Sequence, residues 1–240
     1  MSLRIACDLD GTVADMERAL QREAERMFGP GVVLRAVTKP PDEDDGEADE
    51  SAEADESHPD ETVADAPRVL SAREVRSLWS HVRRIENFWT TLEELEDGAV
   101  RRFAALSAAH RWHVVFMTRR PQTRGESAQL QSQRWLQAKG YLLPSVCVVS
   151  HSRGVLAGAL DLNAVIDDRP ETCLDVLADS KAEPILVWRA DPATIPLGVT
   201  GLGVTAVPSF HAALDRLEER ATAARRPGFV DRIKAALRSQ

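Results

Sequence analysis

The sequence predicts an α/β fold in which helices cover a parallel sheet and a small helical insertion follows the first strand. From residue 98 onward, short apolar runs alternate with segments of helical periodicity, a pattern typical of strand–helix–strand units. Residues 14–95 lack this alternation and contain two helical patterns separated by an acidic stretch. At 240 residues and 43% hydrophobic content, the chain is long enough for one core and an insertion.

The predicted core begins with an apolar run that ends at Asp8 and resumes after the insertion. By apolar periodicity we expect helices at 98–110, 125–139, 153–160, 171–180 and 209–224. We expect further strands at 113–118, 145–150, 163–167, 184–188 and 203–207. The core then comprises residues 1–13 and 96–224, and residues 225–240 form a C-terminal helix or tail.

The insertion, residues 14–95, is expected to form a small helical cap. Apolar residues recur at helical spacing over 13–27 until a Gly-Pro pair ends the pattern. A second helix is expected to begin where Ser71 and Glu74 form a capping-box signature ahead of more apolar residues at helical spacing. The two helices therefore bracket the acidic stretch.

The acidic stretch, residues 41–67, holds 13 Asp and Glu and no Lys or Arg. Such a segment buries too little apolar surface to offset the entropy of ordering, so we expect a disordered loop. It is a solvated tether or, alternatively, an interaction element with a protein partner that the sequence does not name. Without these 13 residues, 25 acidic residues face 30 Lys and Arg. This mild, dispersed positive charge suits a small anionic substrate and argues against a nucleic-acid polymer.

The apolar runs, the first residues and the cysteines indicate the cellular compartment in which the protein is expected. No stretch approaches the roughly 18 uninterrupted apolar residues of a membrane span, and residues 1–13 lack the features of a signal peptide. Cys7, Cys147 and Cys173 are too few and too scattered for a disulfide framework or a zinc site. We therefore expect a cytoplasmic protein without a membrane partner, and a homodimer stays open.

Polar residues stand where four predicted strands end. A parallel sheet brings these ends to one edge, where ligands bind in open α/β sheets. The residues at or just after the strand ends are Asp8, Thr118, Arg153, Asp167 and Asp168. Converging carboxylates repel one another in a partly desolvated site, and a hard divalent cation with oxygen ligands would offset that repulsion. We therefore expect Mg²⁺ at a site formed by Asp8, Asp10, Asp167 and Asp168.

The same residues indicate phosphoryl transfer. Asp8 would attack the phosphorus of a substrate to form an aspartyl-phosphate. Asp10 would protonate the leaving alkoxide and then deprotonate the attacking water. Thr118 supplies a hydroxyl donor for a phosphoryl oxygen, and Arg153 is the cation for the charge of the transition state. These four residues are the predicted catalytic set.

Three motifs resemble those of the haloacid dehalogenase (HAD) superfamily: DLDGT at 8–12, FMTRR at 116–120 with Thr118 at the strand end, and IDD at 166–168. The resemblance implies a HAD-like, Rossmann-like core and a Mg²⁺-dependent hydrolase. Within the superfamily, Asp10 argues for phosphate chemistry. One departure is that Arg153 stands where the family usually has a Lys, and the two side chains differ in reach and geometry.

A narrower resemblance is to the cytosolic 5'(3')-deoxyribonucleotidase branch, through 88-FWTTLEELEDGA-99 and 133-QRWLQAKG-140. That branch uses aromatic residues of the cap against the nucleobase, so Phe88 and Trp89 become candidates for stacking, with packing in the core or between cap and core as the alternative. Arg119 is a further candidate for substrate binding, with a solvated turn as the alternative.

The sequence thus predicts a Mg²⁺-dependent phosphomonoester hydrolase that acts on a small substrate, with a nucleoside monophosphate as the first hypothesis. A phosphatase for sugars or other metabolites is the alternative within enzymes. From a different class, the exchange of Lys for Arg153 leaves open a non-catalytic protein that binds a phospholigand or serves as a scaffold.

Overall fold

The computed structural model describes residues 2–34 and 68–225. The predicted acidic loop at 41–67 lies outside the described residues, and so does all but the first residue of the predicted tail at 225–240. Among the described residues, no helix has the length and apolarity that crossing a membrane requires.

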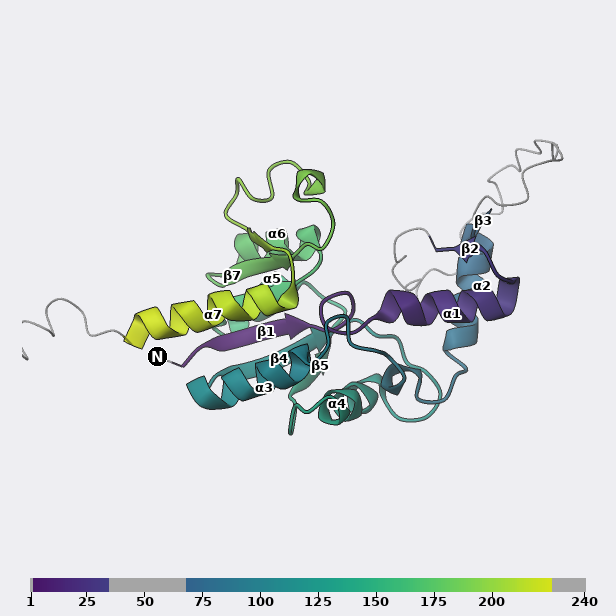
Figure 1. The fold of residues 1–240 in the computed structure, drawn as a ribbon, viewed down its shortest axis with the longest axis horizontal. Coiled ribbons are helices and arrows are strands. Elements are labelled where there is room, and N and C mark those ends of the chain that lie inside the picture. The colour runs from purple at the N-terminus through teal and green to yellow at the C-terminus, as the bar shows by residue number, and fades with distance from the viewer. Residues whose placement is uncertain (1, 35–67, 226–240) are drawn as a thin grey trace, which may run out of the picture.

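The centre of the fold is a six-stranded sheet with the order β5-β4-β1-β6-β7-β8 (Figure 1). All five strand pairs are parallel. The strands are β1 Arg4–Asp8, β4 His113–Thr118, β5 Val146–Val148, β6 Ala164–Asp167, β7 Glu183–Val187 and β8 Thr205–Val207. Because β1 lies between β4 and β6, the carboxyl ends of these three strands meet at the middle of one sheet edge.

Helices cover both faces of the sheet. Ile5 packs in the larger apolar core with Phe103, whereas the next residue, Ala6, packs on the opposite face with Ala157 and Val176. This follows from the alternation of side chains along a strand. The larger core contains α3 Ala99–His110, α4 Ala128–Ala138 and α7 Phe210–Arg225. The opposite face holds α5 Arg153–Ala159 and α6 Pro170–Asp179. The predicted α/β fold is confirmed.

The inserted region contains α1 Met16–Phe28, β2 Val32–Val33, β3 Arg68–Val69 and α2 Ala72–Val82. Figure 1 places α1 and α2 beyond the carboxyl end of β1, apart from the sheet. The predicted capping box is present, since the Ser71 backbone N–H donates to Glu74 (2.9 Å) and the Ser71 side chain accepts from the Glu74 N–H. Hydrogen bonds from Ser71, together with Arg68, lower the pKa of Glu74 to about 2. The short parallel pair β2–β3 was not predicted.

One predicted helix starts later than expected. The sequence predicts a helix from residue 125, but α4 begins at Ala128, with Ser127 as its N-cap. Gly125 has φ +97°, and a Cβ at this position would lie 2.4 Å from the Asn87 side chain. The chain therefore turns at Gly125 and cannot be helical there. The proposed division into a core of 1–13 and 96–224 and a cap of 14–95 stays a prediction.

Helices α5 and α6 pack closely because Gly154 has no side chain. A Cβ at Gly154 would lie 2.1 Å from the backbone oxygen of Asp175 in α6. Since Gly154 directly follows Arg153, this contact also fixes where the first turn of α5 places that guanidinium.

We expect Gly154→Ala to lower the free energy of unfolding by about 1–3 kcal/mol, because overpacking against a backbone atom outweighs the gain of about 1 kcal/mol in helix propensity. Urea unfolding monitored by circular dichroism measures this change. Gly201→Ala is the matched control, since its Cβ would find its nearest neighbour at an ordinary 3.6 Å. Equal stability of the two variants would contradict the close packing of α5 on α6.

Candidate active site

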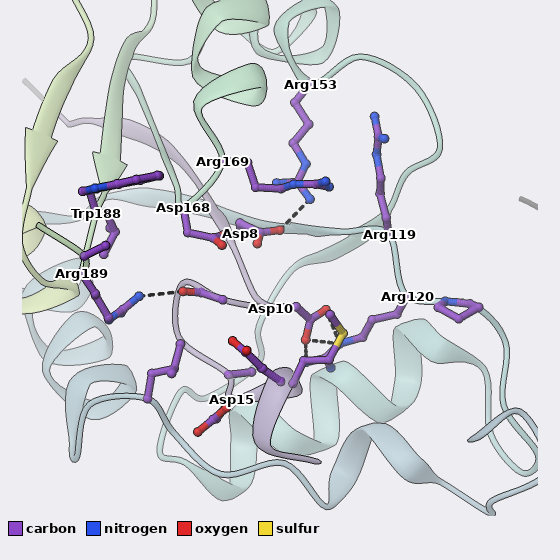
Figure 2. Close-up of a pocket in the computed structure, with 18 residues that line it drawn as sticks. Asp8, Asp10, Asp15, Arg119, Arg120, Arg153, Asp168, Arg169, Trp188 and Arg189 are labelled. Atoms are coloured by element: carbon purple, nitrogen blue, oxygen red, sulfur yellow. Dashed lines mark hydrogen bonds and ion pairs between the residues drawn. The ribbon is translucent and has the colours of Figure 1, made fainter. Parts of the chain in front are cut away.

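Three carboxylates, those of Asp8, Asp167 and Asp168, meet at the middle of the sheet edge, and Figure 2 shows two of them, Asp8 and Asp168. Asp8 ends β1 and Asp167 ends β6, and the pairing of these strands brings the two residues side by side. One oxygen each from Asp8, Asp167 and Asp168 lies within 4.8 Å of the others. Asp8 is 4% exposed and Asp167 is 0% exposed. The structure therefore concentrates negative charge in a place that water barely reaches.

Arg153 is the cation inside this cluster. Its Nη2 lies 2.6 Å from Asp8 Oδ1, and its Nη1 donates to Asp167 Oδ2. The residue is the first of α5, whose N-cap is Ser152. The guanidinium thus bridges two of the three carboxylates, as Figure 2 shows for Asp8.

The pKa shifts follow from this burial. Burial raises the pKa of Asp8 well above its ordinary value, although Arg153 acts in the opposite direction. Burial, together with the charge of Asp167, raises the pKa of Asp168 to about 7. Burial disfavours the charge of Arg153, but the attraction of Asp8 and Asp167 is larger in sum and raises its pKa. The single positive charge of Arg153 therefore does not balance the negative charge of the three carboxylates.

The cluster fits a hard divalent cation. Three carboxylates and one guanidinium leave two formal negative charges, and carboxylate oxygens are the ligands that Mg²⁺ prefers. The ion pair with Arg153 uses Oδ1 of Asp8, and Thr12 donates to Oδ1 of Asp168 at 3.1 Å.

Asp10, the fourth predicted metal ligand, does not join this cluster among the described residues. Its carboxylate binds Arg120, whose Nη2 donates to Oδ1 at 2.7 Å. Thr118 also donates its hydroxyl hydrogen to Asp10, at 3.0 Å from Oδ2. The hydroxyl that was expected to donate to a phosphoryl oxygen therefore already serves Asp10.

Gly11 allows the loop after β1 to approach Asp168. Its φ is +85°, and a Cβ there would lie 2.2 Å from Asp168 Oδ2. A glycine is required on both counts, because other residues rarely adopt this φ and none would fit the space. Thr12 is fully buried and, through its hydrogen bond, keeps Asp168 against the loop.

A second arginine ties the same loop to the end of β7. Arg189 donates from Nη1 to the carbonyl of Gly11 (2.7 Å) and from Nη2 to that of Thr12 (2.8 Å). Glu96 accepts from Arg189 at 2.7 Å and from the backbone N–H groups of Phe210 and His211 at the start of α7. Arg189 was not predicted as a site residue, although it directly follows the predicted strand 184–188.

Phe88 and Trp89, the predicted stacking residues, lie in the 3₁₀ turn Phe88–Thr90 (η1). They are 2% and 0% exposed, and their rings meet edge to face at 5.0 Å. The indole Nε1 of Trp89 donates to the carbonyl of Pro121 at 2.9 Å. Neither residue lines the cavity beside Asp8, so in this structure neither ring is presented to a ligand.

A cavity of about 510 Å³ opens beside Asp8. Its apolar lining residues include Ala14, Met16, Leu95, Val187 and Trp188. The basic side chains in its lining are Arg119, Arg120, Arg153, Arg169 and Arg189. Arg119 was predicted from the sequence, whereas Arg169 and Trp188 were not. Arg169 follows the predicted strand 163–167 by two residues, and Trp188 is the last residue of the predicted strand 184–188, so the strand-end rule could have found them.

Solved structures share the fold of this chain. A crystal structure of a HAD-family hydrolase from Deinococcus radiodurans, with bound phosphate and sodium, superposes with a TM-score of 0.51 and 14% identity. The match covers 92% of this chain and 96% of that chain. The chain has the HAD-type hydrolase fold.

A second structure, a haloacid dehalogenase-like family hydrolase from Xanthomonas campestris, has 16% identity and a TM-score of 0.47 over 93% of this chain and 95% of that chain. No protein-family model matches the sequence, and no curated protein does. In this chain, the DLDGT, Thr118 and IDD motifs lie at the carboxyl ends of three adjacent strands.

The Glu96–Arg189 pair gives a prediction for stability against pH. Burial opposes the charge of Glu96, but hydrogen bonds from Phe210, His211 and Arg189 outweigh it and lower its pKa. A lowered folded-state pKa stabilises the fold above the ordinary value of 4.5, and this contribution is lost as the pH falls through the folded value.

We expect Glu96→Gln to lower the free energy of unfolding by roughly 1–3 kcal/mol at pH 7, with the gap to the wild type closing as the pH falls below the ordinary pKa. Urea unfolding at a series of pH values measures both. Glu93→Gln, which removes exposed ion pairs with Arg18 and Arg22, is the control and should cost less than about 1 kcal/mol. A gap that widens toward acid would contradict the assigned direction.

Proposed function

We propose that this chain is a Mg²⁺-dependent phosphomonoester hydrolase whose nucleophile is Asp8. The observation that carries the proposal is the Asp8 carboxylate, which is buried at the strand end, opens on the cavity and is flanked by Arg153, Asp167 and Asp168. The Deinococcus hydrolase of the same fold is described with bound phosphate, which supports an anionic phosphoryl ligand for this chain.

Asp8 and Asp168 are the residues proposed to hold the metal. Asp167 would keep the Arg153 guanidinium in place beside Asp8. When bound, the ion would withdraw charge from a phosphoryl oxygen and reduce the repulsion between an anionic nucleophile and an anionic substrate. Arg153 already neutralises part of the charge on Asp8 and Asp167. Its exchange for the usual Lys of the superfamily keeps a positive charge next to the nucleophile.

The proposed reaction proceeds in two displacements. An oxygen of Asp8 forms a bond to phosphorus while the bond to the leaving oxygen breaks, and Asp10 gives a proton to that oxygen. In the second step Asp10 takes a proton from water, the water oxygen bonds to phosphorus, and the bond to Asp8 breaks. Inorganic phosphate leaves, and both carboxyl groups return to their starting states.

Arg119 and Arg169 are proposed to bind the phosphoryl oxygens. Both line the cavity, and among the described residues no carboxylate forms an ion pair with either of them. Within the described part of the chain, the Arg119 guanidinium donates to the carbonyl of His151, at 3.3 Å. This pair takes over the role first expected of Thr118, whose hydrogen goes to Asp10.

The substrate is proposed to be a small phosphomonoester whose organic part contacts apolar residues that line the cavity. Met16 and Glu17 of α1 contribute to that lining, which supports a role for the inserted helices as a cap that selects the leaving group. A nucleoside monophosphate stays a hypothesis. The burial of Phe88 and Trp89 removes the feature that favoured it, so sugar phosphates are equal candidates.

We expect the wild type to hydrolyse p-nitrophenyl phosphate only with Mg²⁺, and Asp8→Asn to lower kcat by roughly 10³-fold or more because the nucleophile is lost. A colorimetric assay before and after EDTA measures both. The control is Asp161→Asn, an exposed residue with φ +49°, a conformation that Asn tolerates. A wild type that binds phosphate but releases no product would contradict hydrolysis and favour a binding protein of this fold.

We expect Arg119→Met and Arg169→Met each to raise the KM for a phosphomonoester by roughly tenfold, because each removes a charged hydrogen-bond donor to the phosphoryl group. Inorganic phosphate should weaken as an inhibitor by a similar factor. Steady-state kinetics with phosphate inhibition measure both. If kcat falls while the KM and the inhibition constant of phosphate stay unchanged, the two arginines do not bind phosphate in the ground state.

A further inference from the structure

A second ion pair lies beside the carboxylate cluster and serves Asp10. Arg120 presents one edge of its guanidinium to this carboxylate: Nη2 donates to Oδ1 at 2.7 Å, and Nε donates to Oδ2 at 2.9 Å (Figure 2). Thr118 adds a third donor at 3.0 Å. A planar fork bound to both carboxylate oxygens fixes the orientation of the carboxylate as well as its place.

The guanidinium of Arg120 is itself held from the other sides. Its side chain is 0% exposed, and its Nη1 donates to Ser132 Oγ at 2.9 Å. The ring of Trp89 lies 5.0 Å from its central carbon, and the ring of Trp135 lies at 6.0 Å. Both distances suit a cation–π contact.

The two indoles are in turn anchored by hydrogen bonds. Trp89 donates from Nε1 to the carbonyl of Pro121, which directly follows Arg120, and its backbone N–H donates to Gln131 in α4. Trp135 donates from Nε1 to the carbonyl of Leu92 at 2.8 Å. The segment that returns from the inserted region is thereby tied to α4 and to the turn after β4, with Arg120 enclosed between them.

We propose that Arg120 is a positioning residue for Asp10, with Trp89 and Trp135 as the wall that keeps its guanidinium in place. The proposal rests on the proposed function, in which Asp10 moves protons at the leaving oxygen and at the attacking water. Arg120 and Thr118 both donate to the Asp10 side chain, so together they fix the direction in which its two oxygens point.

The test is a double-mutant cycle between Arg120→Met and Asp10→Asn, measured as kcat and KM on a phosphomonoester. If Arg120 acts through Asp10, Arg120→Met should lower kcat by roughly 10²-fold with little change in KM, since general acid–base catalysis contributes about 10²–10⁴. In the Asp10→Asn background the same change should then have little further effect. If the two losses multiply, Arg120 has a separate structural role and the proposal is overturned.

Two further variants keep the test sound. Ser132→Ala removes the Nη1 partner without removing a charge, and it should lower kcat several-fold in the wild type but not with Asp10→Asn. If Arg120→Met does not fold, Ser132→Ala tests the positioning role in its place. Arg134→Met, an exposed arginine of α4 paired with Glu126, is the matched control and should leave kcat unchanged.

A structural readout separates this proposal from the proposed function. If the wild type hydrolyses no phosphomonoester, the proposed function fails, and crystal structures of the wild type and of Arg120→Met then judge the positioning role alone. A changed orientation of the Asp10 carboxylate in the variant is the expected result. An Asp10 side chain that keeps its rotamer and its bond to Thr118 without Arg120 would overturn the proposal.

Discussion

The repulsion among Asp8, Asp167 and Asp168 is the constraint on which the rest of the structure depends. All three lie at one sheet edge within 4.8 Å of one another, and a buried charge costs several kcal/mol unless it is paired. Arg153 supplies one positive charge between two of them. The fold can keep this cluster because the strands that carry it pair in register along their buried length, so its geometry is set by the apolar core beneath it.

Two more arginines complete the arrangement by fixing the loop between β1 and α1 from opposite sides. Arg120 holds the Asp10 side chain, while Arg189 holds the carbonyls of Gly11 and Thr12. The three arginines come from different elements and have different acidic partners, so each defines one part of the site. Ion pairs therefore hold the site where the chemistry is proposed, and Arg119 and Arg169, which pair with no carboxylate of the described residues, line the cavity.

The sequence predicts the fold and the carboxylate cluster because both follow from local patterns. A strand that ends in Asp8 and another that ends in Asp167 must place these residues at one edge once the sheet is parallel. The pair between Arg120 and Asp10 joins residues 110 positions apart, and that between Arg189 and Gly11 spans 178. Such pairs depend on side-chain directions and tertiary packing, which periodicity does not encode. The sequence left core packing and stacking on a base open for Phe88 and Trp89, and tertiary packing decides between them, since both are buried.

The central claim is that a buried cluster with excess negative charge takes up a divalent cation through Asp8 and Asp168. The most direct test is a calorimetric titration of the wild type and of Asp168→Asn with Mg²⁺ in the absence of substrate. The wild type should bind one ion, and the variant should bind it at least tenfold more weakly, because second carboxylate ligands contribute strongly to Mg²⁺ affinity. No binding by the wild type, or equal binding by the variant, would contradict the account.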